Sequence, residues 1–184
     1  MPEAPGGRSA VGAGGWCRGR WRRAAGGAAA GAGGCDNPAH MATVTARATR
    51  AVDASPDRVL AFLRDYREAR PRILTDNYSH YRVESGGQGQ GTVIGYHFAA
   101  GRRERDYRLS VEEHSGGLSE RDQLSSYVSR WTVAQAAEGS QVTLEATWDG
   151  AGGIGGVFER TFAPRVLGGI FGEMLNKLAV AVLA

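Results

Sequence analysis

Four aromatic side chains are the residues best suited to recognising a small molecule. Tyr107, Tyr127, Trp131 and Trp148 fall on the apolar phase of segments in which apolar and polar residues alternate. Such rings either pack solidly or line a pocket, and each offers one polar group to a ligand. If they line a pocket, it should have the usual size of a small-molecule site, about 300 to 1,000 Å³.

Two further candidates are adjacent in VIGYHFA, residues 93–99, where Tyr96 precedes His97. Neighbouring residues of a strand point to opposite faces, so only one of the two can put a polar group into a pocket. We favour a solvent-facing His97 but keep both as ligand-binding candidates.

A glycine motif could bind a dinucleotide, because GAGGIG at residues 150–155 matches the pattern GxGxxG. That fingerprint also needs a second parallel strand with an acidic residue about twenty positions on. This chain instead runs through one predicted helix to Ala184. We interpret the motif as a linker and expect no cofactor.

The histidines show no metal-ligand spacing, and no HExxH motif or paired cysteine accompanies them. We therefore predict no metal site. The four histidines are His40, His80, His97 and His114.

Charged residues on the predicted strands offer weaker candidates. Glu112–Glu113 and the pair Glu120 and Asp122 lie near predicted hairpin ends, where we expect a solvated rim. Several arginines could reach a ligand carboxylate or phenolate at a pocket mouth, although lone strand arginines are usually surface residues. These are Arg72, Arg82, Arg105 and Arg130.

The elements that would position these residues begin with a strand and two short helices. Residues 43–54 alternate as a half-buried strand does, and Ser55, Pro56 and Asp57 then supply an N-cap, a first-turn proline and an early carboxylate. The segment REARPRIL, residues 67–74, contains Pro71 and is predicted as a second helical piece.

The middle of the chain predicts an antiparallel meander, because short turn sequences separate its apolar-polar segments. Its last strand places Val142, Leu144, Ala146 and Trp148 on one buried face. The predicted strands span residues 78–84, 92–99, 103–113, 118–126, 128–136 and 141–148.

One long helix should cover that face. Apolar residues recur at helical spacing through the final segment, and Pro164 should bend the helix because it removes a backbone hydrogen bond. Glu173 and Lys177 form a favourable pair four residues apart. The apolar stripe comprises Phe158, Phe162, Val166, Ile170 and Met174, with Leu167, Phe171, Leu175 and Leu178 beside it.

Residues 1–40 differ in composition from the rest. They contain eleven Gly and ten Ala, which favours a disordered tail ahead of a folded domain at residues 41–184. Five arginines against two acidic residues give this tail a net charge of +3, the whole formal charge of the protein, so the remainder is neutral. A neutral domain argues against nucleic-acid binding.

The location is predicted to be cytoplasmic. Arg22–Arg23 is followed by AAGGAAAGAGG, which lacks the apolar run of a targeting segment, and no stretch is apolar enough to span a membrane. Cys17 and Cys35 both lie in the tail, so residues 41–184 hold no disulfide framework and no thiol nucleophile.

This order of elements resembles the START-like (SRPBCC) superfamily of polyketide cyclase/dehydrase and lipid-transport proteins. The resemblance is carried by AVDASPDRVLAFLRD at residues 51–65, SRWTVAQAAEGSQVTLEATW at 129–148 and GGVFERTFAPRVLGGIFGEML at 155–175. It implies an α+β helix-grip fold, in which a curved antiparallel sheet of about seven strands wraps around the C-terminal helix. It also implies a hydrophobic ligand held between sheet and helix.

Three functions fit this resemblance: a carrier of a small lipid-like or polyketide-like molecule, an aromatase/cyclase or dehydrase acting on such a molecule, and a non-catalytic stress or regulatory protein. We favour binding, because no acid-base constellation is visible in the sequence. The ligand-binding residues predicted are Tyr96, His97, Tyr107, Tyr127, Trp131, Trp148, Phe158, Phe162, Leu167 and Phe171.

Overall fold

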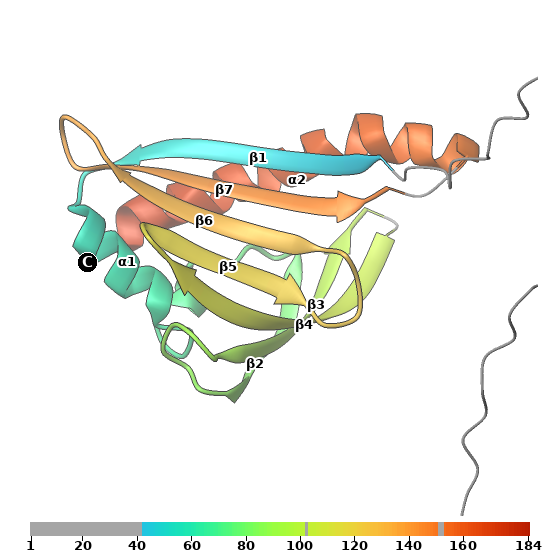
Figure 1. Cartoon of the computed structure of the whole chain (residues 1–184). Coiled ribbons are helices and arrows are strands. Elements are labelled where there is room, and N and C mark those ends of the chain that lie inside the picture. The colour runs from blue at the N-terminus through green and yellow to red at the C-terminus, as the bar shows by residue number, and fades with distance from the viewer. Residues whose placement is uncertain (1–41, 102, 151–152) are drawn as a thin grey trace, which may run out of the picture. The chain divides into compact units, whose positions relative to one another are not determined.

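The computed structural model describes residues 42–101, 103–150 and 153–184, and side chains from residue 163 onward in the last of these segments (Figure 1). The predicted disordered tail, residues 1–40, lies outside the described residues.

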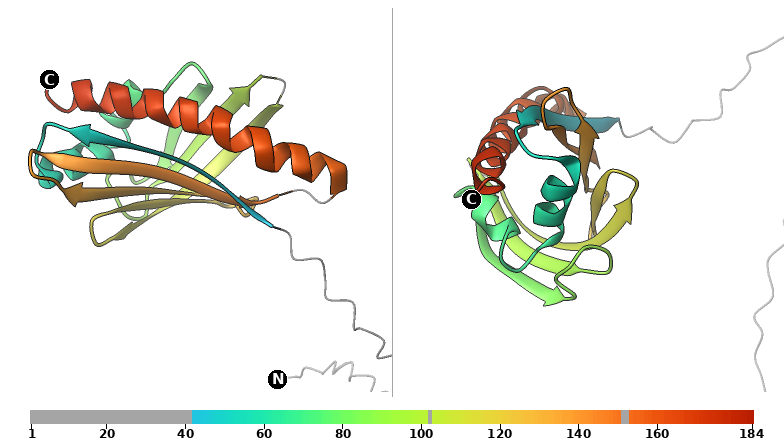
Figure 2. Two further views of the ribbon diagram at one scale, coloured as in Figure 1. Left: turned by 90° about the horizontal axis from the view of Figure 1, so that it is seen from above. Right: turned by 90° about the vertical axis from the view of Figure 1, so that its left-hand side faces the viewer.

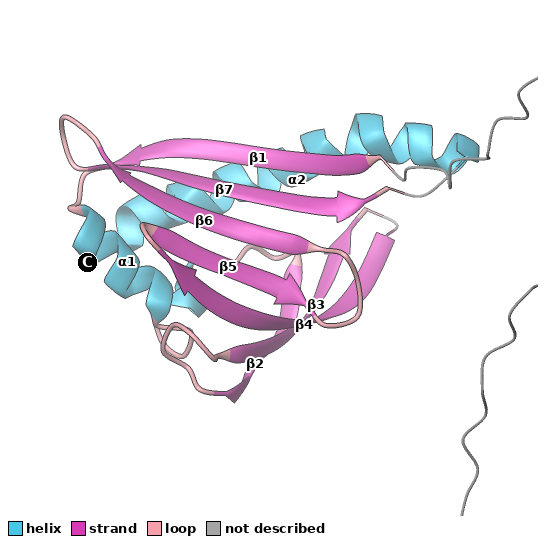
Figure 3. Ribbon diagram, viewed as in Figure 1, coloured by secondary structure: helices cyan, strands magenta, loops and turns pink. Residues whose placement is uncertain are grey.

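Seven strands and three helical segments make up the described chain (Figures 1 and 3). Neighbouring strands pair antiparallel in the order β1-β7-β6-β5-β4-β3-β2, so the first strand closes the meander beside the last. This arrangement confirms the predicted α+β fold with its seven-stranded sheet and long C-terminal helix. The elements are β1 (Thr43–Val52), α1 (Pro56–Arg64), the 3-10 helix η1 (Arg70–Ile73), β2 (Tyr78–Ser85), β3 (Val93–Ala100), β4 (Arg103–His114), β5 (Gly117–Asp122), β6 (Val128–Gln135), β7 (Ser140–Asp149) and α2 (Gly153–Ala181).

Helix α1 begins as its sequence predicts. The Ser55 side chain accepts a hydrogen bond from the Arg58 backbone N–H at 3.4 Å, and Pro56 occupies the first helical turn. Val59 and Leu63 are buried on one face of the helix. The cap therefore fixes where the chain leaves β1 and turns inward under the sheet.

The inner face of the sheet is built by alternation. In β7, Val142, Leu144 and Ala146 are buried while the residues between them are not, and Leu144 is registered opposite Trp131 of β6. Trp148 at the end of β7 is only partly buried. The apolar side of these strands consequently faces the helices.

Helix α2 runs along the concave side of the sheet, as the end-on view in Figure 2 shows. Its described apolar residues Ile170, Phe171, Met174 and Leu175 are buried in the core. Val166 was predicted on this buried stripe, but it is 50% exposed, whereas Ile170, one turn further along the same helix face, is 9% exposed.

The predicted end of the fifth strand was wrong. We expected a strand over residues 118–126, whereas β5 ends at Asp122. The Asp122 N–H donates to the carbonyl of Tyr127 at 2.9 Å, and the Ser125 hydroxyl donates to the Asp122 carboxylate at 2.5 Å. These hydrogen bonds form a turn after Asp122, so residues 123–126 do not continue the strand.

The glycine motif follows β7 and opens α2. The Gly150 N–H donates to the carbonyl of Ala42 at 3.1 Å, and the helix begins at Gly153. Every strand pairing of the described chain is antiparallel, so these residues lack the parallel strand of a dinucleotide fold. Among the helices that the structure describes, none is both long and apolar enough to cross a bilayer.

Candidate functional site

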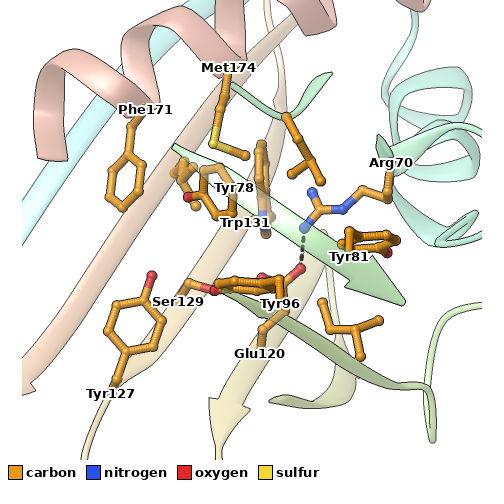
Figure 4. Close-up of a pocket in the computed structure, with 13 residues that line it drawn as sticks. Arg70, Tyr78, Tyr81, Tyr96, Glu120, Tyr127, Ser129, Trp131, Phe171 and Met174 are labelled. Atoms are coloured by element: carbon orange, nitrogen blue, oxygen red, sulfur yellow. Dashed lines mark hydrogen bonds and ion pairs between the residues drawn. The ribbon is translucent and has the colours of Figure 1, made fainter. Parts of the chain in front are cut away.

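A pocket lies between the inner face of the sheet and α2 (Figure 4). Strand β3 contributes Tyr96 and β6 contributes Trp131, while α2 covers them with Phe171 and Met174. The 3-10 helix η1 contributes Arg70. The remaining lining residues are Leu74, Tyr78, Tyr81, Ile94, Glu120, Tyr127, Ser129 and Leu144.

The pocket is smaller than the sequence led us to expect. Its volume is about 20 Å³, against the predicted range of about 300 to 1,000 Å³. A cavity of about 10 to 15 Å³ holds one water molecule, so this one has room for little more. Phe171 and Met174 fill the space because both side chains point from α2 toward the strands (Figure 4).

A buried ion pair forms one wall. The Arg70 guanidinium is bonded through Nη2 to Glu120 Oε1, and the two residues are only 4% and 5% exposed. The Tyr66 hydroxyl donates to the same oxygen at 2.9 Å, and the Ser129 hydroxyl donates to Oε2 at 2.7 Å. Glu120 therefore accepts hydrogen bonds from three donors, which satisfy the oxygens of this buried carboxylate.

Two N–H donors in this wall have no partner among the residues that the structure describes. They are Nη1 of Arg70 and Nε1 of Trp131, and both atoms are buried. The guanidinium carbon of Arg70 lies 4.3 Å from the centre of the Trp131 ring and 5.1 Å from that of Tyr66. These two cation–π contacts help to hold the arginine in place.

The tyrosines that surround the pocket pack against one another. The Tyr96 ring lies 5.1 Å from that of Tyr78 and 5.4 Å from that of Tyr107, whose ring lies 5.0 Å from that of Tyr127. Burial raises the pKa of Tyr96 and of Tyr127 well above the usual value, and neighbouring phenols raise it further. Both side chains are therefore neutral hydroxyls that can donate a hydrogen bond near pH 7.

The structure brings four of the predicted site residues to the pocket, namely Tyr96, Tyr127, Trp131 and Phe171. Tyr107 lies behind them, half-buried against Tyr96 and Tyr127.

Besides Tyr107, five predicted residues are not placed in the lining. Leu167 and Trp148 are partly buried against the core outside it. The side chains of Phe158 and Phe162 lie outside the described residues. His97 was a candidate with Tyr96, but it points to the other face of β3, where its Nδ1 lies 2.9 Å from Asp106 Oδ1. Strand alternation makes this outcome unavoidable once Tyr96 is buried.

None of the four arginines singled out in the sequence is among the described lining residues. Arg72 lies over the Phe62 ring at 5.8 Å, and Arg82 pairs with Glu84 at 2.9 Å. Arg105 lies 3.6 Å from Asp122, and Arg130 is exposed on β6. Among the described lining residues the arginine is Arg70, which was not predicted from the sequence.

The solvated rim predicted for Glu120 and Asp122 was also wrong, because both residues are buried. Asp122 accepts hydrogen bonds from the Arg108 backbone N–H at 3.2 Å and from Ser125. A signal was present in the sequence, since Glu120 and Asp122 share the phase of β5 with the buried Leu118.

No three His, Cys, Asp or Glu side chains gather as metal ligands in the part of the chain that the structure describes.

The chain is similar to a known protein family and to several solved structures. The sequence model of one family, described as "Polyketide cyclase / dehydrase and lipid transport", matches residues 41–182. The solution structure of the KanY protein is 44% identical, with a TM-score of 0.72, and the match covers 78% of this chain and all of KanY. No curated protein sequence matches the chain.

More distant structures share the fold. The Zhui aromatase/cyclase from Streptomyces sp. R1128 is 13% identical with a TM-score of 0.60, and the match covers 77% of this chain and 94% of that one. Major latex-like protein 151 from Panax ginseng is 11% identical with a TM-score of 0.61, over 77% of this chain and 99% of that one. At these identities the likeness shows the helix-grip architecture alone.

Proposed function

Since the chain belongs to the polyketide cyclase/dehydrase and lipid transport family, we propose that it binds a small hydrophobic or aromatic molecule between its sheet and α2. The observation that carries this proposal is the pocket itself, a buried site with aromatic rings from the sheet on one side and apolar side chains of α2 on the other. Aromatic walls with a few polar groups are typical of small-molecule sites.

A ligand larger than water needs one wall to give way. The sheet wall is held by the hydrogen bonds of Glu120 and by the stacking of Arg70 on Trp131. The α2 wall consists of Phe171 and Met174, and an unbranched methionine changes rotamer readily. We therefore propose that a ligand enters by displacing Met174.

Titration with N-phenyl-1-naphthylamine, a neutral apolar fluorophore, tests the proposal. The wild type should bind it saturably. Met174→Trp should weaken binding by about tenfold or more, because the larger ring fills the pocket, and the overpacking itself should cost about 1 to 3 kcal/mol of stability. Val180→Trp is the matched control, since Val180 lies on the same helix and is 72% exposed.

The comparison of the two variants decides the outcome. Melting curves must first show that both are folded. If the folded wild type gives no saturable binding, or if Val180→Trp weakens binding as much as Met174→Trp does, the proposed pocket is not the binding site.

A second candidate is an aromatase/cyclase or dehydrase activity on the bound molecule. The observation that favours it is that Arg70 and the neutral hydroxyls of Tyr96 and Tyr127 line the same pocket. Such donors could polarise a carbonyl of a bound polyketide. Mass spectrometry of a poly-β-ketone incubated with the protein would detect loss of water if this candidate is correct, and an unchanged bound molecule would contradict it.

The proposal also includes a cytoplasmic location. It rests on the absence of cysteine from residues 41–184, which is typical of domains that do not depend on an oxidising compartment.

A further inference from the structure

The pocket carries no net charge. Arg70 and Glu120 are the two charged residues among its described lining, and they form a direct ion pair. An ion brought into such a site would lose its hydration without gaining an unmatched opposite charge, which is costly in a buried environment. The site therefore favours a neutral molecule over a carboxylate.

In the wall formed by Arg70 and Glu120, the acceptor oxygens are bonded, whereas two N–H donors are not. Both oxygens of Glu120 already accept bonds from Arg70, Tyr66 and Ser129. On the donor side, Nη1 of Arg70 and Nε1 of Trp131 have no partner among the described residues. These two N–H groups are therefore available to a ligand. A ligand group that binds them must be a hydrogen-bond acceptor.

The two donors belong to one part of the pocket. The Arg70 guanidinium lies over the Trp131 ring at 4.3 Å, and both residues line the cavity. In Figure 4 the Arg70 guanidinium lies beside Trp131, with one terminal nitrogen facing Glu120 and the other turned away from it.

We propose that the ligand is a neutral aromatic molecule whose carbonyl oxygen accepts hydrogen bonds from Arg70 Nη1 and Trp131 Nε1. This inference rests on the proposed function, because it requires that a ligand enters the pocket. Its ring system lies among the tyrosines and the α2 side chains, and its oxygen lies at the Arg70 end.

Three naphthalenes that differ in one group test the inference by displacing N-phenyl-1-naphthylamine: 2-acetylnaphthalene, 2-ethylnaphthalene and 2-naphthoate. The acetyl and ethyl compounds have similar shapes, but only the first has an acceptor. Trp131→Phe removes one donor and keeps an aromatic ring. The ratio of acetyl to ethyl affinity should fall about fivefold in this variant, which is the typical contribution of one neutral hydrogen bond.

Two further variants complete the design. Trp148→Phe makes the same change at a tryptophan outside the described lining and should leave the ratio unchanged. If Trp131→Phe fails to fold, Arg70→Lys replaces it, because lysine keeps the positive charge beside Glu120 but lacks the second arm of the guanidinium. The ratio should fall in that variant as well.

Each result bears on the inference separately from the proposed function. An acetyl-to-ethyl ratio that neither Trp131→Phe nor Arg70→Lys changes would overturn the inference, while displacement of the fluorophore would still support a binding pocket. Tightest binding by 2-naphthoate would overturn the preference for a neutral ligand. If the fluorophore does not bind the folded wild type, the proposed function fails and the inference fails with it.

Discussion

Arg70 and Glu120 place opposite charges in the buried interior, where they are 4% and 5% exposed. Removing two charges from water costs several kcal/mol for each, and their attraction offsets this cost only when hydrogen bonds complete the pairing. Here Tyr66 and Ser129 supply those bonds to Glu120, at 2.9 and 2.7 Å. The Arg70 side is less complete, since Nη1 has no partner among the described residues. This Nη1 is the donor that the proposed ligand would meet.

Breaking this pair should be costly. Glu120→Gln keeps the shape of the side chain but leaves Arg70 as an uncompensated buried charge, so we expect the free energy of unfolding to fall by about 3 to 5 kcal/mol. Glu173→Gln is the control, because Glu173 pairs with Lys177 at 3.5 Å on an exposed part of α2. It should cost less than about 0.5 kcal/mol. Urea denaturation of both variants measures the difference. Equal losses of unfolding free energy would show that burial does not make the Arg70–Glu120 pair more costly to break than an exposed pair.

The residues of the pocket could be predicted from the sequence only in part. Tyr96, Tyr127 and Trp131 were found because large aromatic residues on an apolar phase have few other places to go. Arg70 and Glu120 were missed because charged residues are almost never fully buried unless paired, and the partner lies 50 residues away. Such pairing depends on how η1 packs against β5, and no local sequence pattern predicts that packing.

At the scale of elements, the position of helix α2 was predicted from the sequence, but the size of the pocket beneath it was not. Its position across the sheet was predicted from its apolar spacing, and its helical course continues through Pro164. The predicted cavity volume was wrong, because the size of a pocket depends on the rotamers of residues such as Phe171 and Met174. Turn chemistry also overrode strand propensity at Asp122, where side-chain hydrogen bonds end β5 earlier than its alternation indicated.

Pro164 tests whether the course of α2 matters for binding. Proline inside a helix removes one backbone hydrogen bond and bends the axis, so Pro164→Ala should straighten the segment and keep or raise the melting temperature. Affinity for N-phenyl-1-naphthylamine should fall by about threefold or more, because the apolar wall of the pocket is carried by the same helix. Melting curves and the titration together measure the two effects. Unchanged affinity in a variant of equal or greater stability would show that Pro164 has no role in shaping the pocket.

The part of the chain that the structure describes is a curved sheet with one solvent-exposed face and one face covered by helices. The hydrogen bond of His97 to Asp106 and the ion pair of Arg82 with Glu84 lie on the outer face, whereas the inner face has tyrosines around the Arg70–Glu120 ion pair. Burying this many ionisable hydroxyls links folding of the whole domain to pH, since each phenol must stay protonated while the chain is folded.

This linkage predicts how the protein unfolds in alkali. Burial raises the pKa of Tyr66, Tyr96 and Tyr127 far above the ordinary value of 10.0, with repulsion from Glu120 as the second cause for Tyr66. Below pH 10 the phenols are protonated in both states, so their contribution is fully present. Above pH 10 the unfolded chain loses these protons and the folded chain does not, so stability falls as pH rises, by about 4 kcal/mol per pH unit for three such groups.

Urea denaturation between about pH 9 and pH 11.5 measures that slope, and tyrosinate absorbance followed over the same range shows when the phenols ionise. We expect the buried phenols to titrate only as the chain unfolds, in one cooperative step. Tyr127→Phe should reduce the slope by about 1.4 kcal/mol per pH unit, because it removes one of the linked protons. Tyr127 tests the pocket in particular, since the residue is 9% exposed and lies in the lining. If its phenol ionised near pH 10 while the protein remained folded, water would already reach the inner face, and the pocket would be open to solvent rather than closed between the sheet and α2.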